Sequence, residues 1–396
     1  RRLQKAEEIF LAVYDIKKAK SQKVADFLSR ISMHPLWGLP VLLLVLYGLY
    51  QFVGVFGAGT LVDLLEQVVF GKFITPWSEK LFSVLMPVEF LRELFVGEYG
   101  LITMALSYSI AIVLPVVATF FLAFGLLEDT GYLPRLAVMM NRIFKLLGLN
   151  GKAVLPMVLG LGCDTMATLT TRILETRKER ILVTLLLALA IPCSAQLGVI
   201  LGLLGGLSFS AVLIWLGCVS GVLVLVGYLA SRVLPGERSD FILELPPIRR
   251  PSIANIMVQT TARVEWYLKE AVPLFFLGTF VLFVLAETGA LETIEQVSAP
   301  LIRGLLGLPE QAAEAFLVGF LRRDYGAAGL FAMARQGLLN PKQIVVSLVT
   351  ITLFVPCIAN FFVIIKERGW RTALAIFLFI IPFAFVVGGM LNFILS

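Results

Sequence analysis

Pro192-Cys193-Ser194-Ala195-Gln196 and Pro356-Cys357-Ile358-Ala359-Asn360 are two copies of one pattern. The pattern is Pro-Cys-x-Ala followed by Gln or Asn, where x is any residue. Each copy interrupts a long apolar stretch that is otherwise predicted to be helical. A proline removes a backbone donor and leaves carbonyls that lipid cannot satisfy, so such breaks occur where they are buried in protein or line a cavity. Each break also carries a thiol and an amide, which are candidate ligands for a soft or borderline cation. Two such breaks in two halves of one chain indicate a transport site.

The composition is that of a polytopic α-helical membrane protein. Of the 396 residues, 59% are hydrophobic and 15% are charged, and the mean hydropathy is +0.91. The apolar stretches are continuous, whereas a transmembrane β-barrel would have alternating ones. The net charge of +6 arises from Lys and Arg in short loops, as in cytoplasmic loops of membrane proteins. The four cysteines lie in or beside apolar stretches, and His34 is the single histidine, so neither a disulfide framework nor a histidine-rich metal site is expected.

Hydropathy and charge divide the chain into five segments. Residues 1–33 are predicted to form a basic amphipathic helix that leads into the membrane from the cytoplasmic side. Residues 34–100 would hold the first transmembrane helix, ending near Phe56, and then an amphipathic segment outside the membrane. The remaining segments are a first repeat at 101–233, a cytoplasmic connector at 234–270 with a helix start at Pro251-Ser252, and a second repeat with a C-terminal transmembrane helix at 271–396.

The two halves of the chain carry similar motifs in the same order. Leu127-Glu128-Asp129-Thr130-Gly131 resembles Ala286-Glu287-Thr288-Gly289, and a proline break follows in each half. Such repeats are typical of secondary transporters, whose sites lie at the repeat interface near the membrane midplane. The apolar piece 153–169 is short and has basic residues on both sides, so we expect a re-entrant hairpin, matched by a second broken segment at 312–334. The repeat is then inverted, whereas a full span at 153–169 would make it parallel.

Several stretches resemble one known family of membrane proteins. They are Leu127-Glu-Asp-Thr-Gly-Tyr-Leu-Pro-Arg135, Gly162-Cys163-Asp164-Thr165-Met166-Ala167, Cys193-Ser194-Ala195, Glu244-Leu245-Pro246-Pro247, Gly319-Phe-Leu-Arg-Arg-Asp324 and Val355-Pro356-Cys357. In this order, and over nearly the whole chain, they resemble the membrane part of the FeoB-type ferrous iron transporters. The resemblance implies an all-α polytopic protein with gate-type repeats that carries Fe²⁺ inward across the cytoplasmic (inner) membrane of a prokaryote, with its N-terminus in the cytoplasm.

The chain departs from that family in two ways. The family usually has Gly-Cys-Asn-Val-Pro-Ala where this chain has Gly-Cys-Asp-Thr-Met-Ala, so a carboxylate replaces an amide at Asp164. The family's N-terminal GTPase is absent, since the sequence contains no Gly-x4-Gly-Lys-Ser/Thr phosphate loop. GTP and Mg²⁺ would then act only through a GTPase domain, in cis in a longer native chain or in trans. The other predicted partners are the lipid bilayer, a small SH3-like accessory protein and further copies of the chain, with no nucleic acid and no enzymatic activity in the chain itself.

Residue types and the resemblance together give a candidate ligand set for Fe²⁺. Cys193 and Cys357 at the breaks, with Cys163 and Asp164 at the hairpin tip, would replace part of the hydration shell of the ion, and Glu128 would collect cations or act as a gate. The possible gate residues or secondary ligands are Gln196, Asn360, Ser194, Met166, Asp129, Glu287, Arg323 and Asp324. Charges inside a membrane usually mark pathways or partner pairs, so Arg322, Arg323 and Asp324 could form a buried ion network.

Each candidate also has a simpler interpretation. The cysteines could be small packing residues, Asp164 could cap a turn, the other acidic residues could be solvated at the interface, and Arg322 or Arg323 could pair with Asp324. Two other functions fit the chain as a whole, namely a carrier of a small organic solute such as a nucleoside and a non-transporting regulatory membrane module. A nucleoside site would be polar and aromatic and would not need repeated thiols.

Overall fold

The described part of the chain is helical throughout and contains no strand, which confirms the all-α prediction. The computed structural model describes residues 23–34, 37–85, 89–97, 100–205, 207–236, 245–246, 248–321, 323–354 and 356–395. Of the predicted lead-in helix, residues 1–22 lie outside the described residues, and the remainder forms α2 (Lys23–Met33).

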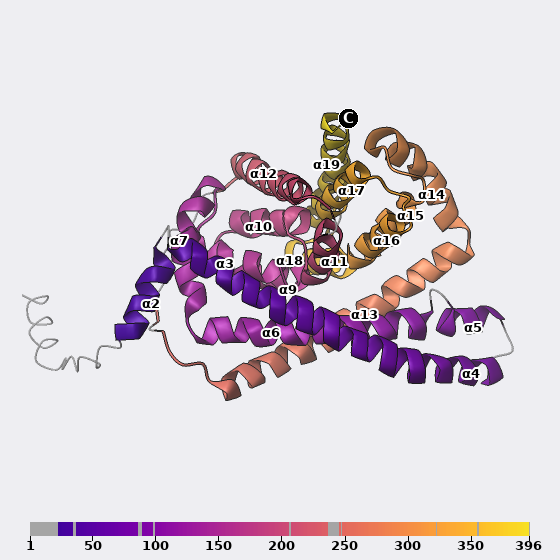
Figure 1. Cartoon of the computed structure of the whole chain (residues 1–396), viewed down its shortest axis with the longest axis horizontal. Coiled ribbons are helices and arrows are strands. Elements are labelled where there is room, and N and C mark those ends of the chain that lie inside the picture. The colour runs from indigo at the N-terminus through magenta and orange to yellow at the C-terminus, as the bar shows by residue number, and fades with distance from the viewer. Residues whose placement is uncertain are drawn as a thin grey trace, which may run out of the picture.

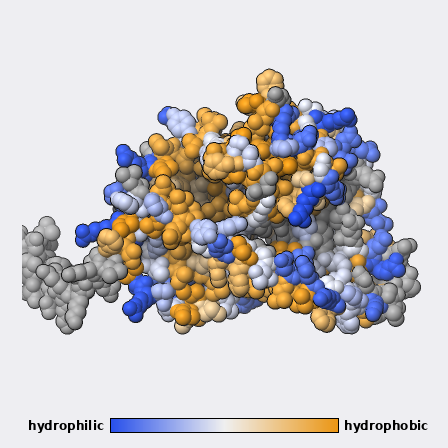
Figure 2. Space-filling view, viewed as in Figure 1, coloured by the Kyte–Doolittle hydropathy of each residue, from blue (hydrophilic) through white to orange (hydrophobic). Residues whose placement is uncertain are grey.

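Five helices of the described part are long and apolar enough to cross a membrane: Gly38–Phe82, Ser109–Asp129, Phe209–Val233, Pro341–Arg368 and Trp370–Ile394. Their outer faces expose large apolar side chains, such as Phe393 at 83% and Val233 at 81%. On the face drawn in Figure 2, hydrophobic side chains cover much of the surface and hydrophilic ones gather toward its margins. Exposing so much apolar surface to water is unfavourable, whereas contact with lipid tails carries no such cost. The chain is therefore a polytopic membrane protein.

The first transmembrane helix is longer than the sequence predicts. Helix α3 (Gly38–Leu49) continues into two stretches of wider π-helical winding, η1 (Tyr50–Leu61) and η2 (Leu64–Ile74), and then into α4 (Thr75–Leu85). The indigo helix therefore runs across the whole molecule in Figure 1 and does not end near Phe56. A Cβ at Gly57 would collide with the side chain of Thr119, so this glycine permits close packing of η1 on the neighbouring α6.

The two repeats have the same order of elements. After α5 (Glu89–Val96), η3 (Leu101–Leu106) and η4 (Tyr108–Val113), the first repeat contains α6 (Leu114–Asp129), α7 (Tyr132–Leu146), η5 (Gly151–Ala153), α8 (Val154–Gly160), α9 (Asp164–Thr170), η6 (Thr171–Ile173), α10 (Arg177–Ala190), α11 (Ser194–Gly205) and α12 (Phe209–Val233). The second contains α13 (Ile253–Glu287), α14 (Ala290–Leu301), η7 (Ile302–Leu306), α15 (Ala312–Leu321), α16 (Arg323–Arg335), α17 (Pro341–Leu353), α18 (Ile358–Arg368) and α19 (Trp370–Ile394). Helices α6 to α12 thus correspond one by one to α13 to α19.

Glycines with positive φ mark the same turns in both repeats. Gly131 (φ 78°) precedes α7, and Gly289 (φ 69°) precedes α14. Gly148 (φ 71°) follows α7, and Gly307 (φ 66°) follows η7. L side chains rarely adopt this backbone conformation, so the sequence places glycine at each of these turns. The matched turns confirm that the motifs at 127–131 and 286–289 belong to an internal repeat.

The repeats pack against each other through equivalent contacts. Helix α9 contacts α18, and its counterpart α16 contacts α11, the counterpart of α18. Within each repeat, a glycine in the last turn of α8 or α15 lies against the helix before the proline break, Gly160 against Leu187 and Gly319 against Ile351. Equivalent contacts made in both directions imply an approximate two-fold axis between the repeats. The buried helices α10 and α17 contact each other within this core (Figure 1).

The predicted helix breaks occur where the sequence places them. Helices α10 and α11 are separated at 191–193, and in the second repeat α17 ends at Leu353 and α18 begins at Ile358. The 153–169 piece is a helix-turn-helix made of α8 and α9, and α7 meets the η5–α8 segment at a bend of 110°. Its re-entrant character and the inverted sense of the repeat stay predictions.

The connector between the repeats is partly helical. The Ser252 hydroxyl accepts a hydrogen bond from the backbone N–H of Asn255, which confirms the predicted helix start. Helix α13 then runs unbroken from Ile253 to Glu287, so the second repeat's leading helix begins well before residue 271.

Candidate functional site

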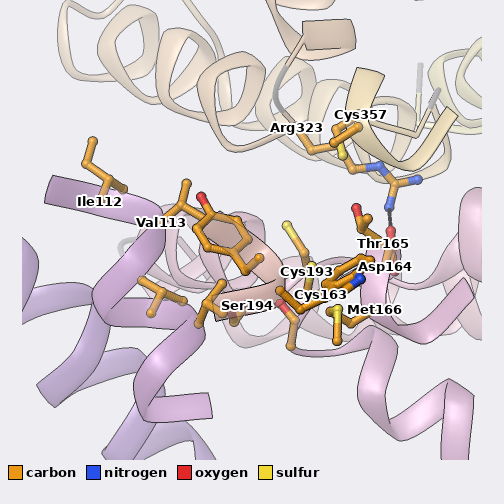
Figure 3. A pocket seen from close by; sticks show the side chains of 16 residues that line it. Ile112, Val113, Cys163, Asp164, Thr165, Met166, Cys193, Ser194, Arg323 and Cys357 are labelled. Atoms are coloured by element: carbon orange, nitrogen blue, oxygen red, sulfur yellow. Dashed lines mark hydrogen bonds and ion pairs between the residues drawn. The ribbon is translucent and has the colours of Figure 1, made fainter. Parts of the chain in front are cut away.

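A cavity of about 100 Å³ lies where the two repeats meet. Its wall comes from η4 and α6, the α8–α9 turn, both proline breaks, α13 and the first residue of α16. In Figure 3, Arg323 and Cys357 approach it from one side, and Cys163, Asp164 and Cys193 approach it from the other. The predicted site residues that line it are Cys163, Asp164, Met166, Cys193, Ser194, Arg323 and Cys357. A space of this size has room for several water molecules or a partly hydrated ion.

The three cavity cysteines occupy equivalent local positions. Cys163, Cys193 and Cys357 each stand immediately before a helix, namely α9, α11 and α18. Their carbonyls accept the first backbone hydrogen bonds of those helices, at 3.0, 2.8 and 3.0 Å. The thiols are therefore held at helix starts by the chain breaks themselves. None of the four cysteines forms a disulfide, and Cys218 packs against the core on α12, as the sequence predicts.

An ion pair joins the repeats at the cavity wall. The Arg323 guanidinium donates to Asp164 Oδ2 at 2.6 Å, and the two residues are only 3% and 4% exposed. The sequence predicts an ion network of Arg322, Arg323 and Asp324, whereas the pair described here joins Arg323 to Asp164 of the other repeat. Arg322 and the side chain of Asp324 lie outside the described residues. The second oxygen of Asp164 has no hydrogen-bond partner among the described residues, so this carboxylate retains acceptor capacity.

Arg323 also satisfies carbonyls that the helix breaks leave open. In a continuous helix the residue at position 192 would donate to the carbonyl of Ala188, but Pro192 has no N–H. Arg323 donates to that Ala188 carbonyl and, at 2.8 Å, to the carbonyl of Ile191. It also donates to the Phe354 carbonyl of the second break at 3.3 Å. One guanidinium thus ties the two proline breaks together.

The amides of the two breaks have structural contacts outside the cavity wall. Gln196 donates to the Ile351 carbonyl in the last turn of α17 at 3.1 Å, and Asn360 accepts from the Thr168 hydroxyl at 2.9 Å. Both amides are fully buried and cross from one repeat to the other. The Gln196 carbonyl oxygen and the Asn360 amide nitrogen have no partner among the described residues.

The acidic residues at the ends of α6 and α13 lie elsewhere. Glu128 pairs with Arg263 at 2.8 Å and does not line the cavity. Asp129 accepts hydrogen bonds from Arg249 at 3.0 Å, from the Ser252 backbone at 2.6 Å and from Asn255 at 3.0 Å, and so fastens α6 to the start of α13. Its counterpart Glu287 is exposed.

Sequence reasoning missed the wall formed by α13 and α6. Trp266 and Tyr267 line the cavity from α13, and Val113 and Val117 are among the residues that line it from the first repeat's leading helix. The Tyr267 hydroxyl donates to the Ser109 carbonyl at 3.4 Å. The adjacent aromatic residues could have indicated this wall. A helix that starts at Ser252 would carry them toward the bilayer.

Within the described residues, no three His, Cys, Asp or Glu side chains are close enough together to hold a metal ion. The three thiols and Asp164 share one cavity, yet they surround it and do not converge on one point. The arrangement thus brings candidate ligands together with an arginine among them.

The family model described as "Nucleoside recognition", Gate, matches residues 110–207 and 268–371, one stretch in each repeat and together just over half of the chain. A second model, "Ferrous iron transport protein B C terminus", matches residues 212–263 between them. The chain belongs to the Gate family as an FeoB-type membrane domain. Both Gate matches contain a proline break, so the repeat seen in the helices is also the family's own unit.

Curated relatives resemble this FeoB-type domain over most of its length. The Fe(2+) transporter FeoB of Staphylococcus aureus (strain COL) is 28% identical over 385 residues, which covers 90% of this chain and 57% of that protein. The Fe(2+) transporter FeoB of Methanocaldococcus jannaschii is 28% identical over 321 residues, covering 72% and 48%. In Porphyromonas gingivalis, a fusion of Fe(2+) transport protein A with Fe(2+) transporter FeoB is 29% identical over 288 residues, covering 69% and 32%. The chain thus spans about half the length of the FeoB relatives from S. aureus and M. jannaschii.

Proposed function

We propose that this FeoB-type domain is a permease for ferrous iron, whose role is transport and not catalysis. The observation that carries the proposal is the cavity between the repeats, where thiols from both proline breaks and from the hairpin tip line one space with a carboxylate. Thiol and carboxylate ligands suit a borderline divalent cation, and breaks at a repeat interface are where transporters bind their cargo. Relatives named Fe(2+) transporter support the choice of ion.

The proposed ligands are Cys163, Cys193, Cys357 and Asp164, with Ser194 and Met166 as weaker donors. Because these groups surround the cavity without converging, only some of them would contact the ion at any one moment. Weak ligation at several points suits conduction, since an ion held by a complete set would not leave. Glu128 would act outside the cavity, by attracting cations to the end of α6.

The wider setting is also a proposal. We place the protein in the cytoplasmic (inner) membrane of a prokaryote with its N-terminus in the cytoplasm, so that α2 approaches the membrane from that side. Control by GTP and Mg²⁺ would come from a GTPase domain in cis or in trans. The fused relative of P. gingivalis supports a small accessory protein, which we expect to be SH3-like, as a partner. Further copies of the chain are also candidate partners.

Uptake of labelled Fe²⁺ into cells or proteoliposomes tests the proposal. We expect Cys193→Ser plus Cys357→Ser to lose most of the uptake, because both breaks lose their thiol. Cys218→Ser is the matched control, since Cys218 packs on α12 away from the cavity. Wild-type uptake by the double variant would exclude the thiol role. Stabilisation of the purified protein by nucleosides and not by Fe²⁺ or Mn²⁺ would contradict the choice of cargo.

A further inference from the structure

The cavity wall already contains a cation of its own. Arg323 and Asp164 are the only charged side chains among the described residues that line it. Their charges cancel, so the wall offers no net negative charge to an entering divalent cation. A metal ion placed among the thiols would instead share this space with a guanidinium.

The helix starts around the cavity also disfavour an entering cation. Helices α11, α16 and α18 all begin at residues that line it or directly adjoin a lining residue. Each helix start carries a partial positive charge, which disfavours a nearby cation. Besides the thiols, the groups that favour a cation are therefore Asp164 and the open carbonyls of the breaks.

Arg323 donates hydrogen bonds to Asp164 and to open carbonyls of both breaks. Its hydrogen bonds go to Asp164 Oδ2, to two carbonyls beside the first break and to the Phe354 carbonyl of the second. Hard oxygen atoms of this kind are what a transported divalent cation would use in place of water. The planar guanidinium satisfies several of them at once, which a lysine ammonium could not do in the same geometry.

We propose that Arg323 is a built-in cation that closes the transport site. While its guanidinium holds Asp164 and the carbonyls of both breaks, the repeats stay locked together and the ion lacks its oxygen ligands. The site opens when α16 withdraws the guanidinium. This inference rests on the proposed permease function for its biological meaning, but the closure itself can be measured without iron.

Thiol reactivity reports whether the cavity is open. In a Cys218→Ser background, all remaining thiols line the cavity, and their rate of alkylation by N-ethylmaleimide can be followed in purified protein. We expect Arg323→Gln to raise that rate about tenfold or more, because removing one partner of a buried pair destabilises the closed arrangement. Arg303→Gln is the matched control, since Arg303 forms an exposed pair with Glu310 at 3.0 Å, and it should leave the rate unchanged.

Two more variants separate the charge of Arg323 from its hydrogen-bonding geometry and test the anchor Asp164. Arg323→Lys keeps the charge but loses the fork of donors, so its alkylation rate should lie between wild type and Arg323→Gln. If Arg323→Gln does not fold, Asp164→Asn removes the charged anchor and should raise the rate as well. An unchanged rate in the folded variant, or an equal rise with Arg303→Gln, would overturn the closing role.

Uptake measured on the same proteins separates the two proposals. Faster alkylation without Fe²⁺ uptake by any variant or by wild type would support closure and refute the iron permease. Normal Fe²⁺ uptake with unchanged alkylation in Arg323→Gln would support the permease and refute closure.

Discussion

Asp164 and Arg323 are equivalent residues of the two repeats, and they are bonded to each other at 2.6 Å. Each stands four residues after a glycine that packs on the core helix of its own repeat, Gly160 or Gly319, and each begins the second helix of its hairpin. Equivalent residues that touch must lie close to the two-fold axis relating the repeats. The ion pair therefore lies close to that axis, where the two repeats meet.

Exchanging the two charges tests this placement. Asp164→Arg alone or Arg323→Asp alone leaves two like charges buried together, and each should destabilise the protein by at least about 3–5 kcal/mol. The combined exchange restores an ion pair near the axis, so it should recover much of the melting temperature of the detergent-purified protein. A double variant as unstable as the two single losses combined would contradict an axial position for the pair.

Asp129 and Glu287 occupy equivalent positions but should respond differently to substitution. Asp129→Ala removes an acceptor of three hydrogen bonds that fasten α6 to the start of α13, so the melting temperature should fall by several degrees. Glu287→Ala is the matched control, because Glu287 is exposed, and it should change little. Equal effects in the two variants would mean that the Asp129 contacts contribute nothing specific.

Substitution of Gly57 should destabilise the protein, whereas substitution of Gly48 on the same helix should not. Gly57→Ala places a Cβ against the Thr119 side chain and should cost about 1–3 kcal/mol of stability through overpacking. Gly48→Ala meets nothing within 4 Å and should be neutral or stabilising, because alanine favours the helix. Thermal unfolding of both variants in detergent measures the difference, and a neutral Gly57→Ala would show that η1 and α6 do not pack closely.

Divalent cations should protect the cavity thiols selectively. Co²⁺ or Mn²⁺, which withstand air better than Fe²⁺, should slow alkylation of Cys163, Cys193 and Cys357, because bound metal competes for the thiolate. Cys218 should react at the same rate with and without metal, since it does not line the cavity. Mass spectrometry of each labelled peptide gives the four rates in one experiment. Equal protection at Cys218 would point to non-specific binding.

Much of this architecture is predictable because it depends on local chemistry. The prolines fix where α10 and α17 end, the cysteine next to each proline becomes the residue before the following helix, and the Glu-Asp-Thr-Gly type turns show the repeat. These signals lie within a few residues of each other in the sequence. Together with the family resemblance they led to the hypothesis of one metal site made of these thiols. The three cysteines line one cavity, and their role as ligands stays a prediction.

The remainder depends on contacts between distant parts of the chain. Arg323 and Asp324 are neighbours in sequence, but the guanidinium bonds to Asp164, which lies 159 residues away. Glu128 is drawn to Arg263 on α13, and no local pattern of the sequence indicates that pairing. The sequence places Trp266 in the connector at 234–270, because the first half of the long α13 helix that carries it to the cavity wall is polar. Packing between repeats decides each of these positions.

The ion pair of Asp164 and Arg323 also constrains how this protein could have arisen. In a symmetric dimer of two identical half-length chains, the residue at this position would face its own copy across the axis, and an acid could meet only an acid. Opposite charges there require the two halves to differ in sequence at this position, as the two repeats of this chain do. The bond near the two-fold axis is therefore available only to halves that are no longer identical.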